Sequence, residues 1–208
     1  LFILFSSFSF SQSLEKLKLE TKKIYDANYT MDFDGITDLT YPKIVESIGN
    51  RDTFLDKLDL DYQNEEYRMR LELITPIFQY SEIKKIEGKT FCVITYRNPI
   101  RYFFENKLDN ATALKKVDWL KENNNTKEVF FEPKRNSINV KRVSKLIAIA
   151  DETTGNEWKF FNFDDAEQRA IFKTIFNETT NLDISHLIPS AYVIKIKNTN
   201  AQLVWIKE

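Results

Sequence analysis

The spacing of apolar residues changes near residue 66, and this change constrains the fold more than any other feature of the chain. In "SLEKLKLETKKIYDANYTMDF", residues 13–33, Leu17 and Ile24 belong to an apolar series with three- and four-residue spacing, which is typical of one helix face. In "YRMRLELITP" the spacing becomes two, because Met69, Leu71 and Leu73 alternate with polar residues, as in a strand with one buried face. Helices followed by a run of strands predict an α+β domain.

Capping residues divide the first part of the chain into short helices. Asp32 is suited to begin a helix over "DFDGITDLT", because its carboxylate accepts hydrogen bonds from the first backbone amides. Pro42 fits the first turn of "YPKIVESIG", and Gly49 fits its C-terminal cap. Asn50 is then placed to cap "RDTFLDKLDLDYQ".

The rest of the chain reads as strands with two interspersed helices. Gly88 separates "SEIKKIEG" from "KTFCVITYR", which predicts a hairpin. The stretch "NATALKKVDWLKENN" returns to helical spacing, and "DDAEQRAIFKTIFNET" predicts a further helix with Asp164 as its cap. The remaining predicted strands are "EVFFEP", "INVKRV", "KLIAIAD" and "EWKFFNF".

The polar cluster Asp151–Glu157 lies between the last two of these strands and raises the question of a metal loop or an acid/base pair. Its acids lack the ligand spacing of an EF-hand and have no neighbouring histidine. We therefore expect a hairpin connection, in which Gly155 supplies a positive φ and Trp158 anchors the returning strand.

The N-terminal stretch "LFILFSSFSFSQS" predicts the location of the protein. An apolar run followed by the small-x-small pattern Ser9-Phe10-Ser11 is typical of the end of a secretory signal peptide. The stretch lacks a starting Met and a basic n-region, so we expect residues 1–11 to be a signal-peptide remnant. The alternative is a buried first strand or helix. Residues 12–189 are then expected to form one domain, residues 190–208 a C-terminal β-hairpin, and the mature protein is expected to be secreted or periplasmic and not a lipoprotein.

Two longer stretches resemble a known superfamily. They are "ETKKIYDANYTMDFDGITDLTYPKIVESIGNRDTFLDKL", with its Tyr41-Pro42 break and Gly49 stop, and "KLIAIADETTGNEWKFFNF" with the later helix "RAIFKTIFNETTNLDI". Over about residues 14–188 the chain resembles the nuclear transport factor two-like (cystatin-like) superfamily, in particular secreted members from the Bacteroidetes group. The resemblance implies a cone-shaped roll, in which a curved antiparallel sheet wraps around N-terminal helices. The superfamily includes isomerases, dehydratases and non-enzymatic binding modules, so it does not select a function.

The residues with the most reactive side chains give little support for catalysis. The chain has one histidine, His186, which we expect in a loop at the domain edge, with only Asp183 nearby as a carboxylate partner. The single cysteine, Cys92, alternates with Ile94 on one strand face, which favours a place in the core. We expect no metal site, because such sites usually need three or four ligands, and no cofactor. A net charge of −1 predicts no nucleic-acid partner, and the apolar N-terminal stretch is too short to span a membrane.

An internal pocket in such a domain is expected to be lined by aromatic side chains with polar tips. The candidate ligand-binding residues are Tyr29, Tyr41, Tyr80, Tyr96 and Trp158. The alternative for these residues is a packed core with the polar tips at the surface.

Three functions remain open from the sequence. The first is a non-catalytic module that binds a small apolar ligand or a protein partner. The second is an isomerase- or dehydratase-type enzyme that uses tyrosines and carboxylates inside the cone. The third is a structural subunit that pairs with its partner through the hairpin at residues 190–208.

Overall fold

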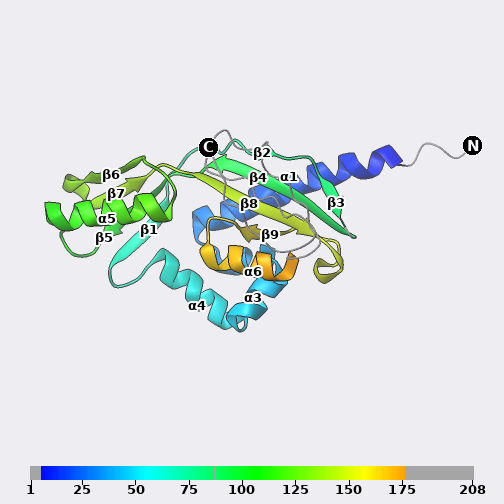
Figure 1. Ribbon diagram of the computed structural model, residues 1–208, viewed down its shortest axis with the longest axis horizontal. Helices are drawn as coiled ribbons and strands as arrows, with labels where there is room; N and C mark the ends of the chain where they lie inside the picture. Colours follow the sequence, from blue (N-terminus) through cyan, green and yellow to red (C-terminus); the bar gives the residue numbers. More distant parts are fainter. Residues whose placement is uncertain (1–5, 87, 177–208) are drawn as a thin grey trace, which may run out of the picture. The chain divides into compact units, whose positions relative to one another are not determined.

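Helices form the first part of the chain, and most of their boundaries have the predicted local causes. The computed structural model describes residues 6–86 and 88–176. Figure 1 shows the elements coloured along the sequence. The helices that precede the first strand of the described chain are α1 (Ser6–Thr30), α2 (Phe33–Leu39), α3 (Pro42–Ile48) and α4 (Arg51–Tyr62).

The predicted caps of the short helices are confirmed. Asp32 Oδ1 accepts a hydrogen bond from the Gly35 amide at 2.9 Å, and Asn50 Oδ1 accepts one from the Thr53 amide at 3.0 Å. Gly49 ends α3 with a φ of 140°, a conformation that L-residues rarely adopt. These side chains satisfy backbone groups that would otherwise lack partners at the helix ends.

Helix α1 is longer than predicted, because it begins at Ser6 rather than near residue 13. Its buried face is the predicted apolar series, with Leu17, Thr21 and Ile24 shielded from solvent. Helix α1 therefore continues through the expected cleavage point, and processing of this segment stays a prediction.

The strands form two sheets, and the fold class α+β is confirmed. In the first sheet the order is β1-β5-β7-β6, with antiparallel neighbours. In the second sheet the order is β2-β4-β8-β9, and β3 pairs with β4. The strands are β1 (Tyr67–Leu71), β2 (Gln79–Tyr80), β3 (Lys84–Ile86), β4 (Lys89–Arg97), β5 (Ile100–Phe104), β6 (Val129–Glu132), β7 (Ser137–Val140), β8 (Val143–Ala150) and β9 (Lys159–Asn162).

The described chain divides into two compact units, each assembled from two segments. The first unit comprises residues 6–77 and Tyr96–Ser144, and the second comprises Phe78–Thr95 and residues 145–176. The first unit contains α1 to α4, the first sheet, the helix α5 (Asn110–Asn123) and the short 3-10 helix η1 (Pro133–Arg135).

One hydrophobic core of the first unit lies between α5 and one face of the first sheet. Helix α5 packs against β6 and β7, as Figure 1 shows. Because successive side chains of a strand point to opposite faces, every second residue of these strands lies on the face covered by α5. The buried core residues are Ile100, Phe104, Val117, Leu120, Val129, Ile138 and Val140.

The core of the second unit is rich in phenylalanine. Helix α6 (Ala166–Phe176) packs on β9, and Phe172 lies at the centre of the contact. Its ring meets Phe161 and Phe163 edge to face, at centroid separations of 5.1 and 5.3 Å. Such edge-to-face pairs add stability beyond the burial of their surface.

The connection from β8 to β9 is the predicted hairpin turn. A short 3-10 helix, η2 (Glu152–Thr154), follows Asp151, and Gly155 has the predicted positive φ, 61°. Asp151 Oδ1 accepts a hydrogen bond from the Thr154 amide, and the Thr154 hydroxyl oxygen accepts one from the Asp151 amide. Trp158 is buried immediately before β9.

Two local predictions were wrong. Asp164 does not cap α6: its carboxylate accepts from the Lys145 amide, and Asp165 accepts from the Glu167 and Gln168 amides instead. Asp165 takes this role because it immediately precedes the first helical residue. Leu73 is exposed, because β1 ends at Leu71 and the alternation beyond it no longer faces a core. The predicted hairpin at residues 190–208 lies outside the described residues.

Candidate functional site

A pocket of about 390 Å³ lies in the first unit, beside α5 and the paired strands β1 and β5. Its size falls within the range of small-molecule sites in proteins. The residues that line it are Glu66, Tyr67, Tyr102, Phe104, Thr112, Lys115, Lys116, Trp119 and Leu120.

The register of β1 and β5 brings the aromatic wall of the pocket together. Tyr67 lies directly opposite Phe104, and Tyr102 lies on the same face two residues along β5. The Tyr67 and Tyr102 rings meet edge to face with centroids 5.0 Å apart. Helix α5 packs on β6 and β7, so it covers the far side of this sheet face, and the rings of Tyr67 and Tyr102 beside it remain partly exposed.

Helix α5 supplies the facing wall through a second stripe beside its core stripe. Ala113, Val117 and Leu120 are buried against the sheet. Lys116 and Trp119 lie on the adjacent stripe, which follows the same three- and four-residue spacing. Trp119 remains 56% exposed, so a large part of its indole is open to solvent beside the pocket.

One ion pair crosses the pocket from the sheet side to the helix. Lys116 Nζ pairs with the Glu66 carboxylate and also lies 5.2 Å from the centre of the Phe104 ring. This distance is within the range of a cation–π contact. The Glu66 side chain is 58% exposed, whereas that of Lys116 is 23% exposed. The lysine is thus held against the aromatic wall, and its carboxylate partner lies at the solvent edge.

The two tyrosines of the wall are neutral at ordinary pH. Burial raises the pKa of Tyr102, and the positive charge of Arg142 opposes this rise in pKa only in part. Burial also raises the pKa of Tyr67. Both hydroxyl groups therefore keep their protons and can donate as well as accept hydrogen bonds.

A second hollow of about 280 Å³ adjoins the first and shares Glu66, Phe104, Thr112 and Lys116 with it. Its far wall is the loop at residues 106–109, which leads into α5. Asn136 fixes this loop: its side-chain amide donates to the Phe104 and Asn106 carbonyls, and its oxygen accepts from the Leu108 amide. The two hollows together form a groove along the first turns of α5, with the Glu66–Lys116 pair between them.

The five aromatic residues predicted from sequence are distributed over both units. Tyr41 is buried as the residue before α3, Tyr96 is buried and contacts Tyr25 edge to face, and Tyr29 is partly exposed on α1. These three belong to the first unit, whereas Tyr80 on β2 and Trp158 belong to the second. The groove beside α5 is lined by other residues, and a ligand-binding role for these five stays a prediction.

Sequence reasoning missed the residues of the groove, although one signal was available. Trp119 follows Lys115 by four positions and Thr112 by seven, which places all three on one stripe of an otherwise polar helix face. A tryptophan in such a stripe indicates either a packing partner or a ligand. No sequence pattern links Tyr67 and Tyr102, because they come together only through the pairing of β1 with β5.

The other chemically active side chains have structural surroundings. Cys92 is buried, as predicted, and its thiol donates to the Ser81 carbonyl at 3.5 Å. Burial raises the pKa of this thiol, which keeps it in the less reactive protonated form. His186 lies outside the described residues. Among residues 6–86 and 88–176, no three His, Cys, Asp or Glu side chains converge on a metal site, and no helix has the length and apolarity needed to cross a membrane.

Comparisons of this chain with protein families, with curated proteins and with solved structures found no match.

Proposed function

We propose that this protein is a non-catalytic binding module that holds a small, ring-bearing ligand in the pocket beside α5. The observation that carries the proposal is the exposure of Trp119 next to three further rings, those of Tyr67, Tyr102 and Phe104. Around this hollow Trp119, Tyr67 and Tyr102 offer apolar surface with two hydroxyl groups, while Lys116 lies over the ring of the buried Phe104. A flat ring that enters would bury apolar surface on both sides and could hydrogen-bond at its edge.

The charges of the pocket favour binding over the alternative of acid–base catalysis. An isomerase or dehydratase that uses tyrosine and carboxylate needs a carboxyl group whose environment tunes its pKa towards neutrality. The carboxylate of this pocket, Glu66, is largely exposed and paired with Lys116. A solvent-exposed carboxylate held in an ion pair is better placed to position a charge than to exchange protons with a substrate inside the pocket.

A titration with a neutral two-ring probe, 2-naphthol, tests the proposal. In two-dimensional amide spectra of the labelled protein, we expect saturable shifts for α5, β1 and β5 and for the Trp119 indole. Trp119→Ala is expected to weaken binding by about 1.5–3 kcal/mol, which is at least tenfold, because it removes one stacking face. The stability of the protein should change little, since Trp119 is exposed.

Leu114→Ala is the matched control, because Leu114 is also an exposed apolar residue of α5 but does not line the pocket. Its affinity for 2-naphthol should equal that of the unaltered protein. Shifts that map to another part of the molecule, or that never saturate, would refute the proposed site.

We also propose, on the N-terminal sequence alone, that the chain is exported. The support is the apolar run before Ser9-Phe10-Ser11. Expression of the gene in its native cell, followed by mass measurement of the mature N-terminus, tests this. A mature chain that retains Leu1 would contradict it. The resemblance to the nuclear transport factor two-like superfamily is likewise a proposal that rests on the sequence stretches quoted above.

A further inference from the structure

We infer that the ligand of this pocket carries an acidic group beside its ring, so that its chemical class is a flat aromatic carboxylate. The inference rests on the proposed function and adds the charge of the ligand to it. It also assigns a role to Glu66: this carboxylate holds Lys116 while the site is empty and gives up that lysine when the ligand's carboxylate arrives.

The ionised groups around the groove give it an excess of positive charge. The two hollows are lined by three lysines, Lys107, Lys115 and Lys116, and by two carboxylates, Glu66 and Asp109. Asp109 is already committed, because its oxygens accept from the Thr112 amide and hydroxyl at 2.8 and 3.0 Å and so cap α5. Among the described ion pairs none joins Lys115 to a carboxylate, although the Lys115 charge acts on Asp109 and helps to lower the pKa of that carboxyl group. The three lysines and two carboxylates leave one positive charge in excess, and Lys115 and Lys116 lie at the rim of the first hollow, where Glu66 is the competing carboxylate.

In the Glu66–Lys116 ion pair, the carboxylate of a ligand can replace that of Glu66 as the partner of Lys116. An ammonium group has three N–H donors, and Lys116 is held in place by its contact with the Phe104 ring independently of Glu66. Glu66 lies at the solvent edge, where an ion pair contributes little and the released carboxylate is readily hydrated. A ligand whose ring lies against Tyr67 and Tyr102 would bring its own carboxylate towards a less exposed position, where the interaction with Lys116 is stronger.

A cationic ligand fits the same surfaces less well. Aromatic walls can bind an ammonium ion through their ring faces. In this pocket the Lys116 ammonium already lies over the Phe104 ring, so the protein itself supplies the cation. A second positive charge would be repelled by Lys107, Lys115 and Lys116 and attracted by the fewer carboxylates, Glu66 and Asp109.

Three probes with one ring system and different charges test the inference: 2-naphthoate, the neutral 2-naphthamide and the cationic 2-naphthylmethylamine. Measured by calorimetry at neutral pH and low salt, 2-naphthoate is expected to bind about tenfold more tightly than the amide, because it gains a charge-assisted hydrogen bond. The amine is expected to bind more weakly than the amide. Added salt should reduce the affinity for 2-naphthoate and leave that for the amide nearly unchanged.

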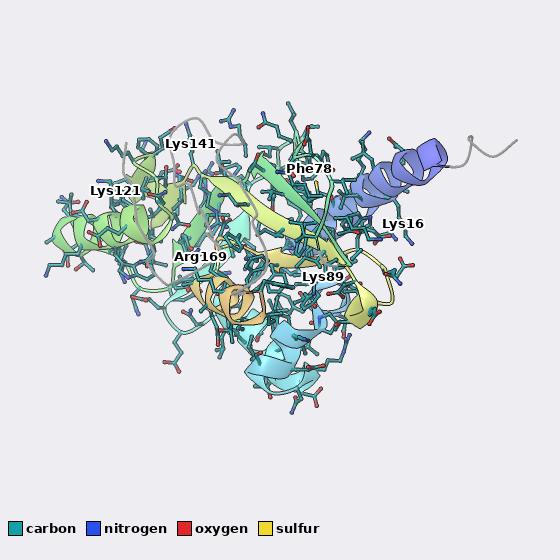
Figure 2. The ribbon with its side chains drawn as sticks, turned by 45° about the vertical axis from the view of Figure 1, so that its right-hand side comes forward. Lys16, Phe78, Lys89, Lys121, Lys141 and Arg169 are labelled. Atoms are coloured by element: carbon teal, nitrogen blue, oxygen red, sulfur yellow. The ribbon has the colours of Figure 1, made fainter. Side chains whose placement is uncertain are left out.

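Substitutions of the ion pair separate the two parts of the inference. Glu66→Gln removes the competing carboxylate and should strengthen binding of 2-naphthoate about threefold or more, with the affinity for 2-naphthamide unchanged. Lys116→Met keeps an unbranched apolar stem against Phe104 and should abolish the preference for 2-naphthoate. Lys121→Met is the matched control, because Lys121 also lies on α5 (Figure 2) but pairs with Asp118 and does not line either hollow. It should leave all three affinities unchanged.

The outcomes distinguish this inference from the proposed function. Equal binding of all three probes would overturn the anionic ligand and leave the ring-binding pocket standing. Tighter binding of the amine would also overturn it, whereas no binding of any probe would remove both proposals. If the amide spectrum shows that Lys116→Met does not fold, the preference for 2-naphthoate over 2-naphthamide is measured in Lys115→Met and Glu66→Gln instead. Unchanged selectivity in both variants would overturn the inference.

Discussion

Substitution of Asp151 tests whether the acidic cluster between β8 and β9 is a turn or a chemical site. Asp151 is only 4% exposed, and its Oδ1 accepts from the Thr154 amide at 3.1 Å. The Thr154 hydroxyl in turn accepts from the Asp151 amide at 3.0 Å and donates to the Asp151 carbonyl at 2.9 Å. These reciprocal hydrogen bonds close η2, so the carboxylate acts as a helix cap.

The expected cost of Asp151→Ala follows from these contacts. Loss of an N-cap side chain typically costs about 1 kcal/mol, and an orphaned buried amide costs about 1–3 kcal/mol. The Thr154 amide keeps a second acceptor, the Asp151 carbonyl at 3.2 Å, so the upper part of this range does not apply. We expect a loss of about 1.5 kcal/mol in the free energy of unfolding. Asp151→Asn retains an oxygen acceptor and should lose less than about 0.5 kcal/mol.

Urea unfolding followed by circular dichroism measures both losses, and hydrogen exchange of the Thr154 and Gly155 amides localises them. Faster exchange at these amides in Asp151→Ala, but not in Asp151→Asn, is the expected pattern. Equal damage by the two substitutions would show that the negative charge matters rather than the acceptor. If Asp151→Ala leaves the free energy of unfolding unchanged, Asp151 does not cap η2.

Three further predictions concern two buried residues, Phe172 and Cys92, and the partly buried Tyr102. Phe172→Ala should cost about 3–5 kcal/mol in urea unfolding, because it removes the ring on which Phe161 and Phe163 pack, whereas Phe172→Leu should cost clearly less. Cys92 should react slowly with iodoacetamide at pH 8 and rapidly in guanidinium chloride, since burial raises its pKa; equal rates would contradict its burial. The pKa of Tyr102 is raised in the folded state, so its contribution to stability is present below pH 10 and is lost as the pH rises beyond it; Tyr102→Phe should flatten this alkaline decline in urea midpoints.

The sequence predicted the helices and turns well because their signals are local. Asp32, Asn50 and Gly49 each act on backbone groups within four residues of themselves, and the structure retains all three roles. The β8–β9 turn was predicted for the same reason, since Gly155 and the preceding acid define it without help from distant residues. The error at α6 was also local: Asp164 and Asp165 are adjacent acids, and the sequence alone does not show which of them is the last non-helical residue.

The candidate pocket was not predicted, because two of its walls depend on contacts between distant parts of the chain. Tyr67 and Tyr102 become neighbours only through the register of β1 and β5, and a shift of one residue would turn Tyr102 to the opposite face. The sequence shows which residues are aromatic but not which of them meet in the fold, so the predicted ligand-binding residues were chosen for their aromatic side chains alone. Tyr41 and Tyr96, for example, are buried in the first unit and do not line this pocket, and their predicted role in ligand binding stays a prediction.

Helix α5 shows how a site of this kind can be recognised from sequence. A helix that only covers a sheet needs one apolar stripe, and Ala113, Val117 and Leu120 already provide it. Trp119 lies outside that stripe and has no need to be apolar for the fold, because a polar residue there would expose less apolar surface. Together with Lys116, which is held against Phe104 across the same hollow, it forms a second amphipathic stripe directed at the pocket. A ligand in the pocket, as proposed, would give this second stripe a role that the core does not require.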